Sequence, residues 1–341
     1  MRYTEWSRSR AGKFTVLFLK MLAAAGILAL LVWKFDLKAE RFRGLPATLL
    51  LAAGGCLLLQ NALTGVRWYF LMRAIGIRVG LGSAVSLTLQ GVFFTLFIPG
   101  GAVSGDVVKA GLVSRRAPDG ERLGAAFSIL IDRIAGLAGL LLLALVSALA
   151  ALVEMPQAEP AFRGVLLAAA AAAPLGLLAI AAAFYCDLFL KVRWINSLFL
   201  WLDHLAHGAL TQLKETVILY RRHWKTVMVC VFASGFVMTP LIAAAFLLVA
   251  VAVAEGAAVP FFSFLLAAGI GEVVGVLPLT PGGIGTRDVA VLEIFKACGC
   301  AAEHAAMIPV VYTSVMVLAS LVGGLFLLWD IAARLIRRKA A

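Results

Sequence analysis

Long apolar segments, separated by short charged connections, constrain this chain more than any other feature of its sequence. Six of them are long enough to cross a bilayer, at residues 15–33, 46–66, 124–152, 162–184, 226–254 and 305–329. A helix of about 20 apolar residues spans the hydrocarbon core, where the backbone must satisfy its own hydrogen bonds. Only 14% of the residues are charged, against roughly 25% in soluble domains. We therefore expect an all-α, polytopic membrane protein.

Two further apolar segments, 81–98 and 260–277, end in a Pro-Gly-Gly sequence. The two copies are Pro99-Gly100-Gly101 and Pro281-Gly282-Gly283, and each Pro is followed seven residues later by an aspartate, Asp106 or Asp288. Because Pro removes a backbone donor and Gly loosens a helix, both segments must stop or bend at membrane depth. Such irregular backbone survives there only inside protein or beside a wet cavity. The matching spacing predicts an internal repeat that divides the chain into the halves 1–160 and 161–341.

The distribution of Lys and Arg predicts how the chain crosses the membrane. If both broken segments are re-entrant hairpins, 21 Lys and Arg lie on the side of the two termini and 6 lie on the other side. The positive-inside rule then places both termini in the cytoplasm. We expect six full spans and two hairpins that enter from opposite faces, an inverted repeat of the kind found in transporters. In the cytoplasmic connection 185–225, apolar residues at helical spacing predict a helix lying in the interface.

Several motifs beside the breaks resemble one known family. They are Arg67-Trp68, Phe97 to Gly101 followed by Gly105-Asp106, Asp132-Arg133, and the stretch from Leu277-Pro278 through Thr280 to Gly285. Over nearly its whole length the chain resembles the lysylphosphatidylglycerol synthase transmembrane family, also called flippase-like membrane proteins. The resemblance implies movement of a lipid between leaflets, with an aminoacylated phosphatidylglycerol, a cardiolipin or an isoprenoid-linked head group as cargo.

The chain departs from the family pattern at two places. Asp288 stands where the second motif usually has Glu, and Val311-Tyr312-Thr313 stands where the last span often has an Arg. The larger family proteins add a soluble aminoacyl-transfer domain, which we do not expect here.

Charged residues inside the spans are the candidate substrate-binding groups, because such residues are costly in lipid. Arg67, Arg133 and Arg287 could hold a lipid phosphate, since a guanidinium matches its oxygens in a bidentate fork. The amides of the two Pro-Gly-Gly turns could cradle the same phosphate, with Asp106 and Asp288 orienting a neighbouring Arg. The alternative for both aspartates is that each stabilises the N-terminus of its returning helix. The alternative for Arg67, which precedes two aromatic residues, is an anchor in the membrane interface.

Glu272 lies among small residues that allow close contact between helices. Burial there favours the protonated carboxyl, so Glu272 is the candidate for proton coupling; the alternative is a neutral Glu hydrogen-bonded at a helix interface. Asp132 is expected to pair with another polar group. Asp203, His204 and His207 have no further ligands nearby in the sequence, so neither a metal nor a cofactor is expected.

Together these features predict a transporter that moves an anionic phospholipid or isoprenoid-linked lipid between the leaflets of the cytoplasmic (inner) membrane. No nucleotide-binding motif is visible in the sequence, so transport would be facilitated or coupled to protons. Two alternatives stay open, an integral membrane transferase acting on a lipid phosphate and an accessory subunit without turnover. The net charge of +12 is explained by orientation in the membrane, so we expect membrane lipid and no nucleic acid as partner. A homo-oligomer is compatible with the sequence.

Overall fold

The computed structural model describes residues 44–97, 102–114, 122–205, 208–253, 259–276 and 280–340. Every regular element within these ranges is a helix, which confirms the predicted all-α fold class. The predicted span 15–33 and the first Pro-Gly-Gly sequence, Pro99-Gly100-Gly101, lie outside the described residues.

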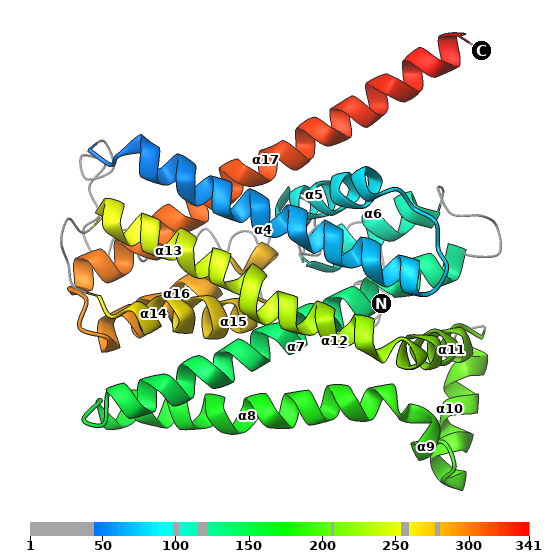
Figure 1. The fold of residues 1–341 in the computed structure, drawn as a ribbon, viewed down its shortest axis with the longest axis horizontal. Coiled ribbons are helices and arrows are strands. Elements are labelled where there is room, and N and C mark those ends of the chain that lie inside the picture. The colour runs from blue at the N-terminus through cyan, green and yellow to red at the C-terminus, as the bar shows by residue number, and fades with distance from the viewer. Residues whose placement is uncertain are drawn as a thin grey trace, which may run out of the picture.

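Five helices in the described part of the chain are long and apolar enough to cross a membrane. They are α4 (Ala47–Ala74), α7 (Arg122–Glu154), α8 (Pro160–Phe184), a continuous unit made of α12 (Trp224–Ala233), the π-helix η2 (Ser234–Met238) and α13 (Thr239–Val253), and α17 (Ala302–Ala340). They correspond to the predicted spans that lie within the described residues. In Figure 1, α4, α7, α8 and the α12–α13 unit run along the long axis of the molecule. The chain is therefore a multi-pass membrane protein.

Described helices flank the first Pro-Gly-Gly sequence, and the second forms a short turn between helices. In the first half, α5 (Leu81–Phe97) ends just before Pro99 and α6 (Ala102–Ser114) follows. The second half has a longer series, α14 (Phe261–Leu266), the π-helix η3 (Ala267–Gly271), α15 (Glu272–Val276), the 3-10 turn η4 (Pro281–Gly283) and α16 (Thr286–Ala297). Figure 1 places α5 and α6 toward one end of the long axis and α14 and α16 toward the other.

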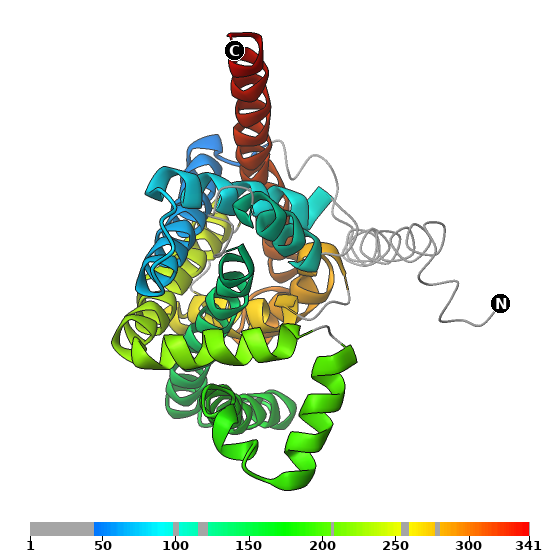
Figure 2. The same ribbon diagram turned by 90° about the vertical axis from the view of Figure 1, so that its right-hand side faces the viewer.

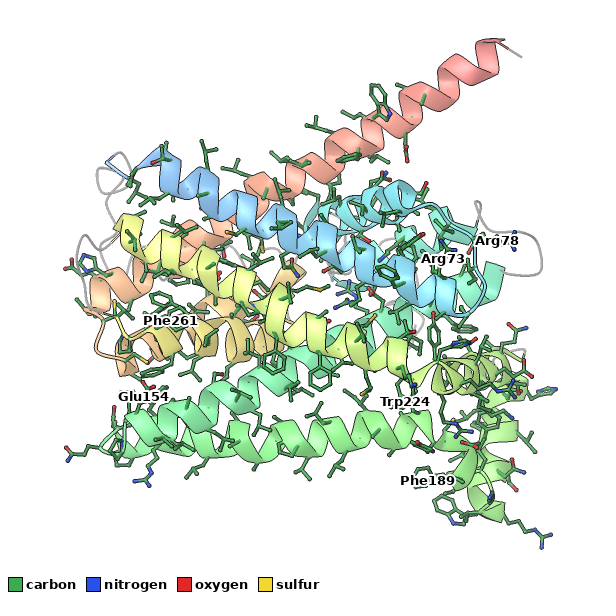
Figure 3. The ribbon with its side chains drawn as sticks, in the orientation of Figure 1. Arg73, Arg78, Glu154, Phe189, Trp224 and Phe261 are labelled. Carbon is green, nitrogen blue, oxygen red and sulfur yellow. The ribbon has the colours of Figure 1, made fainter. Side chains whose placement is uncertain are left out.

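The connection between α8 and α12 consists of three short helices, α9 (Cys186–Phe189), α10 (Arg193–Leu205) and α11 (Ala209–Arg222). They lie at the end of the molecule that also carries α5 and α6, and Figure 2 shows them running across the ends of the long helices. Figure 3 places Arg73, Arg78 and Trp224 at this end, and Glu154 and Phe261 at the opposite end. Arg73 and Arg78 therefore lie at the end of the molecule where the connection lies.

Glycines let the two legs of each broken segment touch. A Cβ added at Gly105 of α6 would collide with the carbonyl oxygen of Gly91 in α5, and one added at Gly283 would lie 2.6 Å from Cα of Gly275. The two broken segments also meet each other, because a Cβ at Gly282 would collide with the side chain of Leu96 near the end of α5. The C-terminal end of α5 is thus in contact with the turn η4.

Candidate functional site

A cavity of about 420 Å³ lies between the first-half helices α4 to α7 and the second-half elements η2, α13 and α15. Its size falls within the roughly 300–1,000 Å³ usual for sites that hold a small molecule or head group. Uncharged polar side chains lining it are Gln60, Asn61, Thr64, Thr88, Thr95, Ser234 and Thr239. The charged ones are Arg67, Lys109, Arg133, Asp106, Asp132 and Glu272. Three cations and three carboxylates therefore face one space between the halves.

The deepest charges form a buried cluster around Asp132 of α7. Arg67 of α4 donates from Nε to Asp132 Oδ1 at 2.8 Å and from Nη2 to the Asp132 carbonyl oxygen at 3.1 Å. Lys109 Nζ lies 3.9 Å from Asp132 Oδ2 and 3.8 Å from the ring centroid of Trp68. The side chains of Arg67 and Asp132 are only 7% and 5% exposed, so their charges are held by each other and not by water.

This geometry corrects the interpretation of Arg67 as an interface anchor. The helix continues to Ala74, about two turns beyond the predicted end of the span, and therefore places Arg67 inside the protein. Gly136 of α7 leaves room for the guanidinium, because a Cβ there would lie 3.2 Å from both terminal nitrogens. The expectation that Asp132 pairs with another polar group is confirmed.

The π-helix η2 supplies a further partner that the sequence analysis missed. Ser234 Oγ accepts a hydrogen bond from Arg67 Nη1 at 2.6 Å, and Met238 Sδ lies 3.8 Å from the same nitrogen. Ser234 and Gly235 pack directly on Gly139 of α7, where a Cβ would lie 2.7 Å from the Gly235 nitrogen. A π-helical insertion inside a long α-helix is often found at functional sites. A serine-glycine pair inside an apolar span was the available signal.

A second ion pair, Arg133 of α7 with Asp106 of α6, opens on the same cavity. Arg133 donates from Nε to Asp106 Oδ2 at 2.8 Å and from Nη2 to Oδ1 at 2.9 Å, which is a bidentate fork. The two side chains are 47% and 29% exposed. Asp106 is the fifth residue of α6, so the expectation that it lies in the first helical turn is wrong. It pairs with Arg133 instead.

The equivalent aspartate of the second half does stabilise a helix start. Asp288 Oδ2 accepts a hydrogen bond from the amide of Gly285 at 2.8 Å, immediately before α16. Its Oδ1 accepts from Thr313 Oγ1 at 2.8 Å and from Arg287 Nη2 at 3.3 Å. Arg287 Nη2 also donates to Thr313 Oγ1 at 2.7 Å. Arg287 and Asp288 are buried and are not among the described residues that line the cavity.

The amides of the second Pro-Gly-Gly turn are not all available to an anion. The amide of Gly283 donates to the carbonyl oxygen of Thr280 at 3.3 Å, and the amide of Gly285 is held by Asp288. The predicted amide cradle is therefore wrong for these two groups. Gly282 and Gly283 have φ of +60° and +72°, a backbone conformation that favours glycine. Pro281 begins the 3-10 turn that they complete.

Glu272 connects this second cluster to the cavity. It begins α15, directly after the π-helix η3, and its side chain is 23% exposed. Its Oε1 accepts a hydrogen bond from the hydroxyl of Tyr312 at 3.3 Å and from Arg287 Nη1 at 3.5 Å. Tyr312 is held by stacking on Phe246, with ring centroids 3.9 Å apart. Tyr312 and Thr313 are thus site residues that were noted in the sequence only for lacking a cation.

Asp203, one of the residues considered for a metal, has a structural role. Asp203 accepts hydrogen bonds from Thr211, at 2.9 Å from its amide and 2.6 Å from its hydroxyl, and so links α10 to α11. Within the described ranges, no group of three or more His, Cys, Asp or Glu side chains could hold a metal ion. His207 lies outside those ranges.

Comparison with known proteins gives one family match. No curated protein and no solved structure matches the chain. A family model described as the lysylphosphatidylglycerol synthase TM region matches residues 17–324, a range that includes α4 to α16 and every cavity-lining residue named above. The chain therefore belongs to the family of the lysylphosphatidylglycerol synthase transmembrane region.

Proposed function

We propose that this protein moves a phospholipid or isoprenoid-linked lipid with an anionic head group between the leaflets of the cytoplasmic membrane. The observation that carries the proposal is the cavity between the two halves, whose lining is mostly apolar but includes six charged side chains, among them the half-exposed guanidinium of Arg133. Charged side chains inside a membrane protein mark substrate or ion pathways, because lipid itself cannot stabilise them. The family supports a lipid-related role in the membrane.

The two broken segments would act as re-entrant hairpins that enter from opposite faces. Their positions toward opposite ends of the long axis, with tips in contact at Leu96 and Gly282, support this arrangement. The halves 1–160 and 161–341 would then form an inverted repeat, with both termini in the cytoplasm. Rocking of one half against the other would open the cavity to each leaflet in turn.

Arg133 is the proposed ligand of the head-group phosphate, because its fork of donors opens on the cavity and matches two phosphate oxygens. The acyl or isoprenoid tail would stay in the bilayer. Arg67 and Lys109 both pair with Asp132, so this cluster carries one excess positive charge at the cavity wall. Glu272 is the proposed proton site. Its hydrogen bonds, at 3.3 and 3.5 Å, are longer than those of Asp106 and Asp132, the other two carboxylates that line the cavity.

Reconstitution into liposomes tests this function. Labelled anionic phospholipid in the inner leaflet becomes accessible to an external quencher only when it crosses the bilayer. We expect intact protein and Asp187→Asn to speed this crossing, and Arg133→Gln to abolish the gain. Asp187 is the matched control, because its ion pair with Arg221 has similar exposure but lies in the connection. Equal rates for Arg133→Gln and intact protein would contradict the proposal, and product formation in detergent would favour a membrane transferase.

A further inference from the structure

The ion pairs in the interior of the molecule differ in how readily they can open. In Arg67–Asp132 and Arg287–Asp288 all four side chains are at most 7% exposed. Opening a buried pair leaves two uncompensated charges, whereas an exposed pair contributes little to stability. Of these pairs, only that between Arg133 and Asp106 has both side chains more than a quarter exposed. Arg133 is therefore the cation that can most easily exchange its partner for a ligand.

Asp106 already occupies the donors that such a ligand needs. Its two oxygens lie 2.8 and 2.9 Å from Nε and Nη2 of Arg133. A phosphodiester also presents two oxygens that share a negative charge, and these fit the same edge of a guanidinium. One pair of N–H groups cannot serve both anions at full strength. Carboxylate and phosphate therefore compete for the Nε–Nη2 edge of Arg133.

We propose that Asp106 is a built-in competitor that holds the place of the lipid phosphate on Arg133 until a head group displaces it. The inference rests on the proposed function and adds a residue that sets the affinity of the same site. Because each incoming anion must displace a carboxylate, every anion binds more weakly by the same factor, and the head group leaves more readily once it has crossed. A residue that only orients Arg133 would have the opposite effect on affinity.

The expected size of the effect follows from the exposure of the pair. A partly exposed ion pair closes with an equilibrium constant between about one and five. Competition lowers the apparent affinity by one plus that constant, so by about two- to six-fold. Asp106→Asn removes the competing charge at nearly constant shape and is expected to tighten head-group binding by this factor. Asp106→Glu keeps the competing charge, so it is expected to bind more weakly than Asp106→Asn.

The test is a titration of the full chain in nanodiscs of neutral lipid with short-chain phosphatidylglycerol, a monoanionic phosphodiester. We expect two- to six-fold tighter binding and slower dissociation for Asp106→Asn, and loss of binding for Arg133→Gln. Asp187→Asn is again the matched control, because it opens an Asp–Arg pair of 28% and 32% exposure outside the cavity. It should bind like the intact protein.

The outcomes separate the competitor from the transport function. Weaker or unchanged binding by Asp106→Asn, with binding still lost in Arg133→Gln, overturns the competitor and leaves the proposed function standing. Folded proteins that all fail to bind phosphatidylglycerol overturn both. A parallel titration with glycerol phosphate, which has no tails, distinguishes a lipid head group from a free phosphate ester. Equal affinity for glycerol phosphate would overturn the assignment to lipid.

Discussion

The buried cluster around Asp132 allows a quantitative test of the site. Asp132→Asn keeps the size of the side chain but leaves Arg67 and Lys109 buried without a carboxylate. Removing one member of a buried ion pair costs about 3–5 kcal/mol, because the remaining charge is not compensated. At 7% and 5% exposure, water cannot replace the missing partner, so no reduction for solvent screening applies. We therefore expect Asp132→Asn to lower the free energy of unfolding by about 3–5 kcal/mol.

The more exposed pair, Arg133 with Asp106, provides the contrast, because Arg133 directly follows Asp132 on α7. Asp106→Asn breaks a pair with 47% and 29% exposed side chains and should cost no more than about 1 kcal/mol. Replacing all three buried charges by apolar residues, as Arg67→Met, Lys109→Met and Asp132→Leu, should recover most of the loss. This recovery is expected because no charge is then left buried alone.

Equilibrium unfolding in mixed micelles, by increasing the fraction of denaturing detergent, measures these differences. Helical circular dichroism is the readout, and reversibility is checked by diluting the denaturing detergent. A cost below about 1 kcal/mol for Asp132→Asn would refute the buried cluster as described. Equal costs for Asp132→Asn and Asp106→Asn would refute the distinction between the two pairs.

Three further predictions concern the second half and the connection. Gly299→Ala should lower the free energy of unfolding by about 1–2 kcal/mol, because Gly299 has a φ of +88°. Gly283→Ala should cost clearly more, because its Cβ would also lie within 3 Å of neighbouring backbone. Chemical denaturation compares the two variants. Thr313→Val should cost about 1–3 kcal/mol and Thr313→Ser much less in the same assay, because the valine leaves buried polar groups without their hydroxyl partner. Helix α10 should lie in the membrane interface, so an environment-sensitive dye on Trp201→Cys should be quenched by lipid-borne quenchers. The same dye on Asn196→Cys, on the opposite face, should be quenched by aqueous iodide, and the reverse pattern would contradict this placement.

The connection also shows what pH should change outside the membrane. The hydrogen bond from Arg221 holds the pKa of Asp187 below its usual value. The pair therefore stabilises the fold above the ordinary pKa of an aspartate, near pH 4, and this contribution is lost as the pH falls through the lower folded pKa. In an acid titration followed by limited proteolysis, cleavage within 185–225 should begin at a higher pH in Asp187→Asn than in the intact protein. Identical profiles for this variant and the intact protein would contradict the role of the pair.

The spans could be predicted because the length and polarity of an apolar segment act locally. The breaks could be predicted because a Pro followed directly by two Gly is a strong helix-breaking sequence, whereas the single Pro174 and Pro309 lie inside α8 and α17. The partners in the site could not be predicted, because they come from distant parts of the chain. Arg67 donates a hydrogen bond to Ser234, which is 167 residues away in the sequence. From the sequence alone, Arg67 could be an interface residue, and Ser234 lies in an ordinary apolar span. The π-helices that aim Ser234 and Glu272 at the cavity leave no clear mark in an apolar pattern.

Errors in helix ends account for the remaining corrections. The second span was predicted to end at residue 66, yet α4 continues to Ala74, and this changes Arg67 from an interfacial residue to a buried one. In the same way, α6 begins four residues before Asp106. This aspartate therefore does not cap the N-terminus of α6, and it pairs with Arg133 instead. Helix ends shift by a few residues without changing hydropathy, but a charged residue then changes its surroundings completely.

The central claim is that a lipid head group resides in the cavity between the two halves. Its most direct test is photo-crosslinking in nanodiscs with an anionic phospholipid that carries a photoreactive group on its head, followed by mass spectrometry of the adducts. We predict adducts on cavity-lining helices of both halves, near Asn61, Thr95 and Thr239, and their loss in Arg133→Gln. Adducts confined to outward-facing positions, such as the exposed Leu175 and Leu178 of α8, would contradict the account.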